Sequence, residues 1–361
     1  MNQKGTTENR LKTLRNKMAD ERIDCFLVSG RENRYYLSGF TGDYGFLVIT
    51  DSRQIVFVDS RFVEQTKIET PDWEVRQFLR FHQDLSSLLT ELQAKYVGFE
   101  SNRVSYEDFK ELERNSPSIV FVPFRYFIER IRAIKGEDEL KKIKGAVTIA
   151  EMALSGILGD ELEGKSEEAV ARDLEWKMRL NGAQKVGFDL IVASGYRSAL
   201  PHGVASQKTI NGGEALLFDW GAFKDFYCSD ITRTFFTGSP TIKQRDVYLT
   251  VKEALEEAIA YITAGKSCLD VHKFALSKIQ DSPFKDFAFG HGLGHGVGLE
   301  VHELPFLNAR SEDLLEPGMV LTVEPGIYIP GWGGVRLEDM VLITEKGVEV
   351  LTSFPKEISV I

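Results

Sequence analysis

Glycine occupies every second position from Gly290 to Gly298, which places five glycines within nine residues. Because glycine has no side chain, the backbone of such a segment can come close to a bound species. The chain has only six histidines, and three of them, His291, His295 and His302, lie within twelve residues of one another. This crowding makes the segment the first candidate for a functional site.

Two aspartates beside apolar runs are the second candidate. Asp219 follows the apolar run 215–218, and Asp230 begins the next strand-like run eleven residues later. A hairpin between the two runs would bring the carboxylates side by side. Two carboxylates at such a short distance share either a proton or a metal ion. The alternative is that both aspartates only cap turns, where aspartate is common.

Three further residues extend this set of candidate ligands. His295 lies in the glycine-rich segment, Glu324 ends the apolar run 319–323, and Glu338 precedes the last apolar run. Four carboxylates and one imidazole fit Mn²⁺, Co²⁺ or Zn²⁺ better than a metal that prefers thiolates. Four formal negative charges exceed what one such ion needs, and they suit two ions that share bridging carboxylates.

The length of 361 residues indicates two domains. Helical and strand-like patterns alternate up to about residue 125, which is typical of an α/β domain. Apolar residues then recur at helical spacing over 127–158, so we expect domains at 1–128 and 129–361, with a long helix opening the second. In the second domain the patterns predict further helices and strands: helices at 166–181, 242–262 and 269–279, and strands at 188–193, 214–220, 231–237, 319–324 and 340–344.

Composition excludes several classes of protein. Acidic residues outnumber basic ones by 54 to 44, so the chain lacks the basic stripe that phosphate contacts require and is not expected to bind nucleic acid. We find neither a signal peptide nor a run apolar enough to span a membrane. The three cysteines are far apart and contain no C-x-x-C pair, which argues against disulfides and against a thiolate zinc site. We therefore expect a cytoplasmic protein without a membrane partner.

Six stretches occur in an order that resembles one family. They are 200–203, 218–221, 229–234, 294–303, 323–326 and 334–339. In these stretches the sequence resembles the proline-specific metallopeptidases of the pita-bread family, which includes aminopeptidase P and prolidase. The resemblance extends to a creatinase-like N-terminal domain. It implies an α/β N-terminal domain followed by an α+β pita-bread catalytic domain.

The resemblance also implies roles for individual residues. The implied ligands of two divalent metal ions, Mn²⁺ in the first place with Co²⁺ or Zn²⁺ as alternatives, are Asp219, Asp230, His295, Glu324 and Glu338, with Asp230 and Glu338 bridging. Glu324 is implied as the base that takes the proton of the attacking water. His202 and His302 would hydrogen-bond the substrate and stabilise the tetrahedral intermediate.

Three more residues are predicted near the site, His291 and Arg336 from the resemblance and Tyr328 from its place four residues after Glu324, and each has an alternative interpretation. Arg336 would orient Glu338 or neighbouring groups, or else only pair with Asp339. His291 and Tyr328 would line the substrate pocket, or else be packed among glycines and in the core respectively. His202 and His302 could likewise be an ordinary loop histidine and a strand-end residue.

The implied activity is removal of the residue that precedes proline from small proline-containing peptides by a homodimeric enzyme. Prolidases, which are Xaa-Pro dipeptidases, usually carry arginine where this chain has Phe306, and that arginine suits the free proline carboxylate. We therefore expect an Xaa-Pro aminopeptidase of the aminopeptidase P type, with prolidase as the alternative if Arg310 or another arginine substitutes. A metal-free creatinase-like hydrolase and a non-catalytic binding module are remote alternatives, because both should have lost metal ligands that this chain retains.

Overall fold

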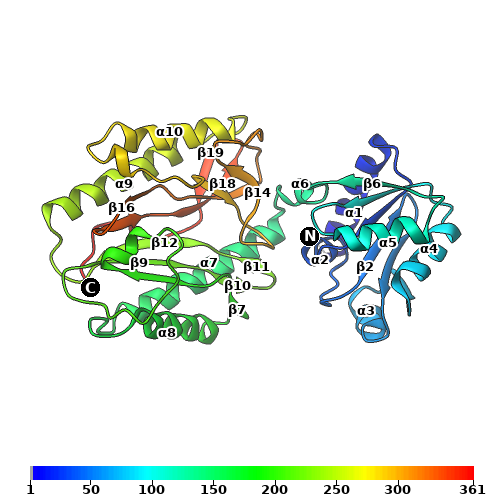
Figure 1. The fold of residues 1–361 in the computed structure, drawn as a ribbon, viewed down its shortest axis with the longest axis horizontal. Coiled ribbons are helices and arrows are strands. Elements are labelled where there is room, and N and C mark those ends of the chain that lie inside the picture. Colours follow the sequence, from blue (N-terminus) through cyan, green and yellow to red (C-terminus); the bar gives the residue numbers. More distant parts are fainter. Residues whose placement is uncertain (1–2) are drawn as a thin grey trace. The chain divides into compact units, whose positions relative to one another are not determined.

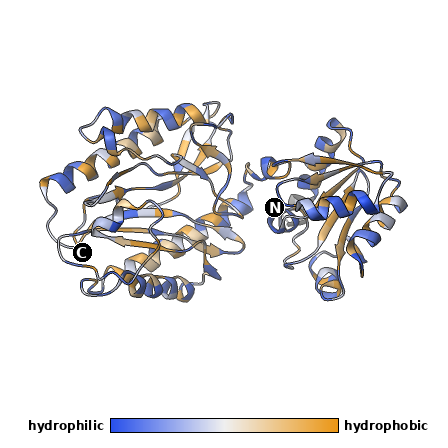
Figure 2. Ribbon diagram, viewed as in Figure 1, coloured by the Kyte–Doolittle hydropathy of each residue, from blue (hydrophilic) through white to orange (hydrophobic). Residues whose placement is uncertain are grey.

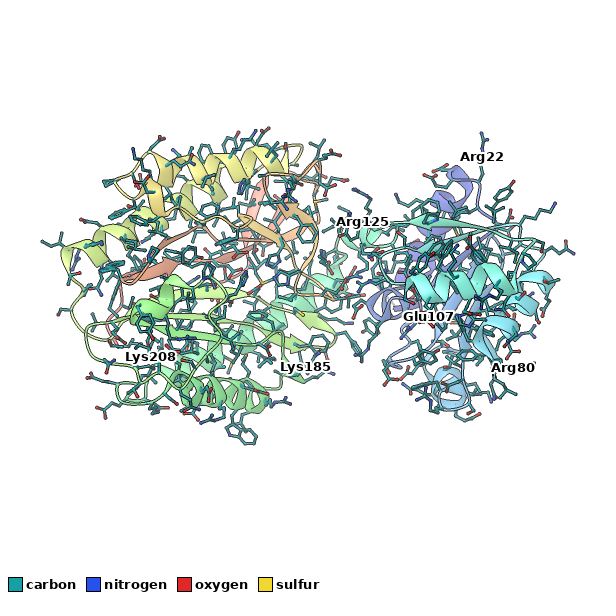
Figure 3. The ribbon with its side chains drawn as sticks, in the orientation of Figure 1. Arg22, Arg80, Glu107, Arg125, Lys185 and Lys208 are labelled. Atoms are coloured by element: carbon teal, nitrogen blue, oxygen red, sulfur yellow. The ribbon has the colours of Figure 1, made fainter. Side chains whose placement is uncertain are left out.

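The computed structural model describes residues 3–361, which divide into two compact units (Figure 1). The first unit ends at Arg132 and the second is Ala133–Ile361. In both units the side chains fill the space between helices and sheets, while charged residues such as Arg22 and Arg80 point outward (Figure 3). No helix within residues 3–361 is both long and apolar enough to cross a membrane.

One mixed sheet forms the centre of the first unit, with the strand order β4-β3-β2-β1-β5-β6. β2 and β3 form a hairpin, pairing in antiparallel register with Ile49 opposite Gln54. β1 pairs with β5 in parallel, as do β3 with β4 and β5 with β6. The strands are β1 (Cys25–Val28), β2 (Phe46–Thr50), β3 (Gln54–Val58), β4 (Glu74–Gln77), β5 (Tyr96–Glu100) and β6 (Val120–Phe124).

Helices cover this sheet because alternate strand residues present apolar side chains to each face. Cys25 and Leu27 belong to a core that also contains Leu85, Leu89 and Leu112 from two of the helices. Figure 2 shows the strands as mostly apolar and the helices as polar on their outer sides. The helices are α1 (Gln3–Asp20), α2 (Arg31–Ser38), α3 (Val63–Glu69), α4 (Phe81–Glu91), α5 (Tyr106–Asn115) and α6 (Glu129–Arg132).

The long helix predicted over 127–158 is present as α7 (Glu137–Ile157), but its predicted start is wrong, because a break separates α7 from the short helix α6. Ile134 forms a β-bridge with Met319, and the Lys135 amide donates to the carbonyl of Gly318 at 2.9 Å. Gly136 then adopts an extended conformation with ψ of 168° as the N-cap of α7. These backbone groups pair across the second unit, which helical periodicity could not reveal.

Two helix pairs and several sheets make up the second unit. Figure 1 shows α7 and α8 on one side of the strands and α9 and α10 on the other. The sheets have the orders β12-β9-β8, β14-β13-β15-β18-β19, β11-β10-β7 and β16-β17. The remaining helices are α8 (Glu167–Leu180), α9 (Ile242–Tyr261) and α10 (Cys268–Gln280), with the short 3₁₀ segments η1 (Gly195–Ala199) and η2 (Lys285–Phe287).

Of the ten predicted site residues, four lie in strands of this unit, and the other six lie in its turns and loops. The bounds of the strands are β7 (Lys185–Val186), β8 (Ile191–Ser194), β9 (Ala215–Trp220), β10 (Ala222–Lys224), β11 (Tyr227–Cys228), β12 (Ile231–Phe236), β13 (Gly294–Gly296), β14 (Glu303–Leu307), β15 (Val320–Val323), β16 (Gly326–Ile329), β17 (Gly333–Arg336), β18 (Asp339–Thr344) and β19 (Gly347–Val350). The strand predicted at 188–193 begins later, at Ile191.

The glycine repeat has a structural function that the sequence did not reveal. β13 lies between β14 and β15, and a Cβ atom on Gly294 or Gly296 would overlap a carbonyl oxygen of the neighbouring strand. These two glycines therefore allow three strands to approach one another closely. At these two positions the glycines allow close approach to the backbone of the neighbouring strands.

Candidate metal centre and active site

Antiparallel pairing of β9 and β12 places the two candidate aspartates. Thr232 lies opposite Asp219, and Ile231 lies opposite Trp220, so Asp230 stands at the start of the returning strand. The predicted hairpin arrangement is thus present. β8 pairs with β9 on the other side, with Ile191 opposite Asp219.

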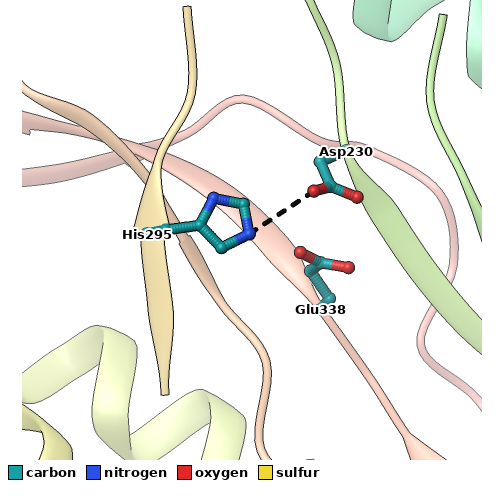
Figure 4. Close-up of side chains that lie close together, drawn as sticks. All are labelled: Asp230, His295 and Glu338. Atoms are coloured by element: carbon teal, nitrogen blue, oxygen red, sulfur yellow. Dashed lines mark ion pairs between the residues drawn. The ribbon is translucent and has the colours of Figure 1, made fainter. Parts of the chain in front are cut away.

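Asp230, His295 and Glu338 form a compact buried group (Figure 4). One ligand atom from each of these residues lies within 4.8 Å of the other two. His295 Nε2 is 3.6 Å from Asp230 Oδ2 and 3.5 Å from Glu324 Oε1. Residues from the start of β12, from β13 and from the turn before β18 thus converge at one point.

Hydrogen bonds fix the orientation of two members of this group. His295 Nδ1 lies 3.1 Å from the carbonyl oxygen of Gly296. A proton on Nδ1 would make this contact a hydrogen bond and leave the Nε2 lone pair facing the carboxylates. The Thr232 hydroxyl donates to Glu338 Oε2 at 2.6 Å, which holds that carboxylate in place.

Burial and mutual repulsion make the charged form of these carboxylates energetically unfavourable. Burial, together with repulsion from Glu338 and other carboxylates, raises the pKa of Asp230 well above its usual range. Burial likewise raises the pKa of Glu338, and it raises the pKa of Glu324 to about 8. Burial lowers the pKa of His295 to about 3, so the imidazole is neutral and able to act as a ligand.

These residues fit divalent metal ions. Asp219 Oδ1 is buried and accepts no hydrogen bond within residues 3–361, although Asp219 Oδ2 accepts one from Arg336 at 2.6 Å. A buried carboxylate oxygen without a donor is unfavourable unless a cation is bound. Oxygen ligands with one imidazole are the donor set of a hard or borderline divalent ion.

The group lies in the wall of a cavity of about 440 Å³, and nine of the ten predicted site residues line this cavity. Such a volume is in the range of small-molecule sites. The predicted residues in its lining are His202, Asp219, Asp230, His291, His295, His302, Glu324, Arg336 and Glu338. His302 lies next to the candidate ligands, with its ring centre 4.2 Å from that of His295.

Tyr328 is the exception, since the cavity lining within residues 3–361 does not include it. Its hydroxyl instead lies 2.9 Å from His291 Nε2 and accepts a hydrogen bond from Arg336 Nη1 at 3.1 Å. The expectation of Tyr328 as a lining residue is therefore corrected. Sequence alone could not show that the tyrosine joins two lining residues to each other.

Of the groups that Arg336 was expected to orient, it contacts a neighbour of Glu338 rather than Glu338 itself. The alternative of a pair with Asp339 is wrong, because Asp339 pairs with Arg233 at 2.7 Å. Arg336 binds Asp219 directly and reaches Glu338 only through Thr232, whose hydroxyl oxygen accepts from Arg336 Nε at 3.1 Å.

Several cavity residues were missed in the sequence. Phe306 lies in the lining, as its place in the sequence suggested, whereas Arg310 is exposed and, within residues 3–361, not part of that lining. The lining residues without a sequence prediction are Phe188, Asp189, Ile191, Pro201, Val204, Gly292, Gly294 and Asn308. In the sequence most of these look like ordinary strand or loop residues, and the pairing of Ile191 with Asp219 is seen only in the structure.

Comparison with known families covers most of the chain. A model described as metallopeptidase family M24 matches residues 141–345, and one described as the creatinase/prolidase N-terminal domain matches residues 10–134. The first match contains every predicted site residue.

Individual relatives are similar over nearly their whole length. An Xaa-Pro dipeptidase of Pyrococcus horikoshii is 39% identical over 93% of this chain and 94% of its own. A solved Xaa-Pro dipeptidase from Bacillus anthracis has a TM-score of 0.95 and 38% identity, covering 98% of this chain and 100% of its own. A solved X-Pro aminopeptidase from Thermotoga maritima has a TM-score of 0.91 and 37% identity, covering 97% and 99% respectively.

Proposed function

This chain belongs to metallopeptidase family M24, and from that membership we propose that it is an Xaa-Pro dipeptidase that splits the bond before proline in dipeptides. The predicted fold is confirmed, with a creatinase-like α/β N-terminal domain followed by an α+β pita-bread domain. Family membership makes the chain a peptidase that binds divalent metal ions. The substrate length, the number of ions and the residue roles are our proposal.

The observation that carries the dipeptidase assignment is the identity of the relatives. Proteins named Xaa-Pro dipeptidase match this chain over almost their full length, both in sequence and in structure. This outweighs the expectation of an aminopeptidase that was drawn from Phe306 alone. A single substitution in a wall of the cavity leaves other ways to accommodate the proline carboxylate.

For metal binding we propose five ligands from the second unit. The residues that would hold two divalent cations, Mn²⁺ in the first place, are Asp219, Asp230, His295, Glu324 and Glu338. When bound, such cations polarise the scissile carbonyl and lower the pKa of water. Their positive charge also offsets the repulsion among the buried carboxylates.

The remaining steps belong to side chains of the chain itself. Glu324, which lines the cavity, would accept a proton from the attacking water and pass it to the leaving proline nitrogen. His202 and His302, both in the cavity lining, would donate hydrogen bonds to the substrate carbonyl as charge develops on its oxygen. Arg336 would keep Asp219 oriented throughout.

Aminopeptidase P activity is the second candidate, and Phe306 is the observation that favours it. Phe306 lines the cavity at the position where prolidases usually carry arginine. A free proline carboxylate would lack that partner here, whereas a longer peptide would lose nothing. One solved relative is also named X-Pro aminopeptidase.

Matched peptides distinguish the two candidates. Enzyme stripped with chelator and reloaded with Mn²⁺, Co²⁺ or Zn²⁺ is assayed on Leu-Pro and on Leu-Pro-Gly, with Leu-Ala as control. We expect hydrolysis of Leu-Pro at a higher kcat/KM than Leu-Pro-Gly, no hydrolysis of Leu-Ala, and no activity before metal is restored. Faster release of leucine from Leu-Pro-Gly would instead establish the aminopeptidase, and inertness on both proline peptides would reject the assignment.

A further inference from the structure

We propose that Glu167, which lies outside the cavity, is a positioning residue for His202. Its carboxylate accepts hydrogen bonds at both ends of the loop 195–205, and this loop carries His202 into the cavity lining. This inference rests on the proposed function, because it takes His202 as a residue that contacts the substrate.

Glu167 is a fully buried carboxylate with an unusually complete set of donors. It is the first residue of α8, and its side chain is 0% exposed. Oε1 accepts from the Ser194 amide at 2.7 Å and from the Ser194 hydroxyl at 2.9 Å. Oε2 accepts from Arg197 Nε at 2.8 Å, from the Ser206 amide at 3.2 Å and from the Ser206 hydroxyl at 2.7 Å.

These donors lie at the two ends of one loop. Ser194 ends β8, Arg197 lies in η1 just inside the loop, and Ser206 follows its far end. A single carboxylate therefore closes the loop. Backbone bonds reinforce the closure, since the amides of Glu167 and Glu168 donate to the carbonyls of Lys208 and Ser206 at 3.0 and 2.9 Å.

The closed loop forms part of the wall of the active-site cavity. Pro201, His202 and Val204 all line that cavity. Arg197, while bound to Glu167, also donates to the Val204 carbonyl at 2.6 Å, which ties the base of the loop to the residues beyond His202. On the cavity side, Arg336 donates to the Pro201 carbonyl at 3.1 Å.

The His202 ring depends on this backbone for its position. Within residues 3–361 the ring makes no hydrogen bond or ion pair, and the residue is exposed. A side chain without its own partner is only as well placed as the loop that carries it. Misplacing a substrate-contacting group by about 1 Å can reduce the rate about 100-fold.

Glutamine is the sharpest substitution at this site. The Glu167→Gln side chain has the same size, but its NH₂ group would face either the Ser194 amide or the Ser206 and Arg197 donors. One end of the loop therefore loses its acceptor, because two donors cannot bond each other. None of the donors to Glu167 is a predicted metal ligand, so metal content should stay at the wild-type value.

A double-mutant cycle tests whether Glu167 acts through His202. For Xaa-Pro hydrolysis we expect Glu167→Gln to lower kcat/KM by about 10- to 100-fold in the wild type, but by less than about 3-fold when His202→Ala is already present. An equal loss in both backgrounds would show a general structural effect and overturn the proposal. If Glu167→Gln does not fold, Ser206→Ala, which removes one donor, should give the same pattern at smaller size.

Glu100 in the first unit supplies a matched control. It is 1% exposed and accepts hydrogen bonds from the Ser29 amide and hydroxyl, the Gly30 amide and Asn33 Nδ2. Glu100→Gln should destabilise the fold to a similar degree yet leave kcat/KM of the folded enzyme within about 3-fold of wild type.

Hydrogen exchange separates failure of this proposal from failure of the proposed function. Amides of segment 195–205 should exchange faster in Glu167→Gln but not in Glu100→Gln, whether or not any proline peptide is cleaved. Unchanged exchange in that segment would overturn the positioning role, whereas inertness of the wild type on Xaa-Pro peptides would reject only the function.

Discussion

Arg336 donates from Nη2 to Asp219 Oδ2 at 2.6 Å, while Asp219 Oδ1 stays buried without a donor in residues 3–361. The arginine thus fixes one oxygen and leaves the other for a cation. Through Nε it also reaches the Thr232 hydroxyl, which donates to Glu338. One guanidinium therefore positions two of the proposed ligands.

Arg336→Lys should weaken metal binding although the charge is retained. A lysine ammonium is a compact charge on a flexible side chain. It cannot replace the planar guanidinium, which donates hydrogen bonds to Asp219, Thr232 and Tyr328 at the same time. We expect metal affinity to fall about 10- to 100-fold, the usual effect of losing a ligand's hydrogen-bond partner. Isothermal titration of chelator-stripped protein with Mn²⁺ measures it, with the exposed Arg310→Lys as control. Equal affinity in the two variants would contradict the ligand-positioning role.

Asp230→Asn should have opposite effects on the metal-free and the metal-loaded protein. The substitution removes one of several buried carboxylates that repel one another, so the stripped protein should gain about 1 to 3 kcal/mol, the ordinary size of a single-substitution effect. It also removes a proposed ligand, so added metal should raise Tm far less than in wild type. Thermal denaturation with and without chelator measures both. A stripped variant less stable than stripped wild type would show that repulsion does not dominate.

In the catalytic domain, the positions of site residues could be predicted best where short motifs coincide with strand ends. Asp219 and Asp230 were placed together from the sequence, because a hairpin between two apolar runs has few other geometries. His295, in a strand, and Glu338, in a turn, are distant from the pair in sequence. Their residue types made them candidate ligands, and the resemblance to a family then implied that they share one metal site with the pair. Periodicity alone would have left them unrelated.

Features that depend on long-range packing could not be predicted from the sequence. The helix break before Gly136 depends on pairing of Ile134 with Met319, which lies far along the chain. Gly294 is required because the backbone of Thr322 in the neighbouring strand lies too close for a Cβ atom. Such contacts leave no local pattern, because the residues on either side have ordinary helical or strand preferences.

Phe306→Arg should shift the enzyme toward dipeptides. Phe306 lines the cavity, and an arginine there would give the free carboxylate of an Xaa-Pro substrate a charged hydrogen-bond partner. Such a bond contributes about 1.5 to 3 kcal/mol, so the ratio of kcat/KM for Leu-Pro over Leu-Pro-Gly should rise about 10- to 100-fold. Phe306→Leu controls for loss of the ring, and a ratio that changes equally in both variants would contradict the electrostatic explanation.

Lys135→Met should destabilise the second unit strongly. Lys135 Nζ lies 2.8 Å from Glu303 Oε1, and the two side chains are 1% and 3% exposed. Removing one partner of a buried ion pair leaves a buried charge poorly compensated and costs about 3 to 5 kcal/mol. Lys144, whose pair with Glu349 is about half exposed, is the matched control, since Lys144→Met should cost at most about 1 kcal/mol. Urea denaturation compares them, and equal losses would contradict the importance of burial.

Alkaline pH should destabilise the protein partly through its buried thiols. Burial raises the pKa of Cys25 from 9.0 to about 12, and that of Cys268 likewise to about 12. Unfolding restores the ordinary pKa, so above about pH 9 the unfolded chain holds fewer protons than the folded one, and the free energy of unfolding falls as pH rises. Each such thiol contributes up to about 1.4 kcal/mol per pH unit. Cys25→Ala should therefore show a shallower decline than wild type in urea denaturation between pH 9 and 11, even though its lost packing lowers stability at pH 7. Parallel declines would show that the Cys25 thiol titrates equally in both states.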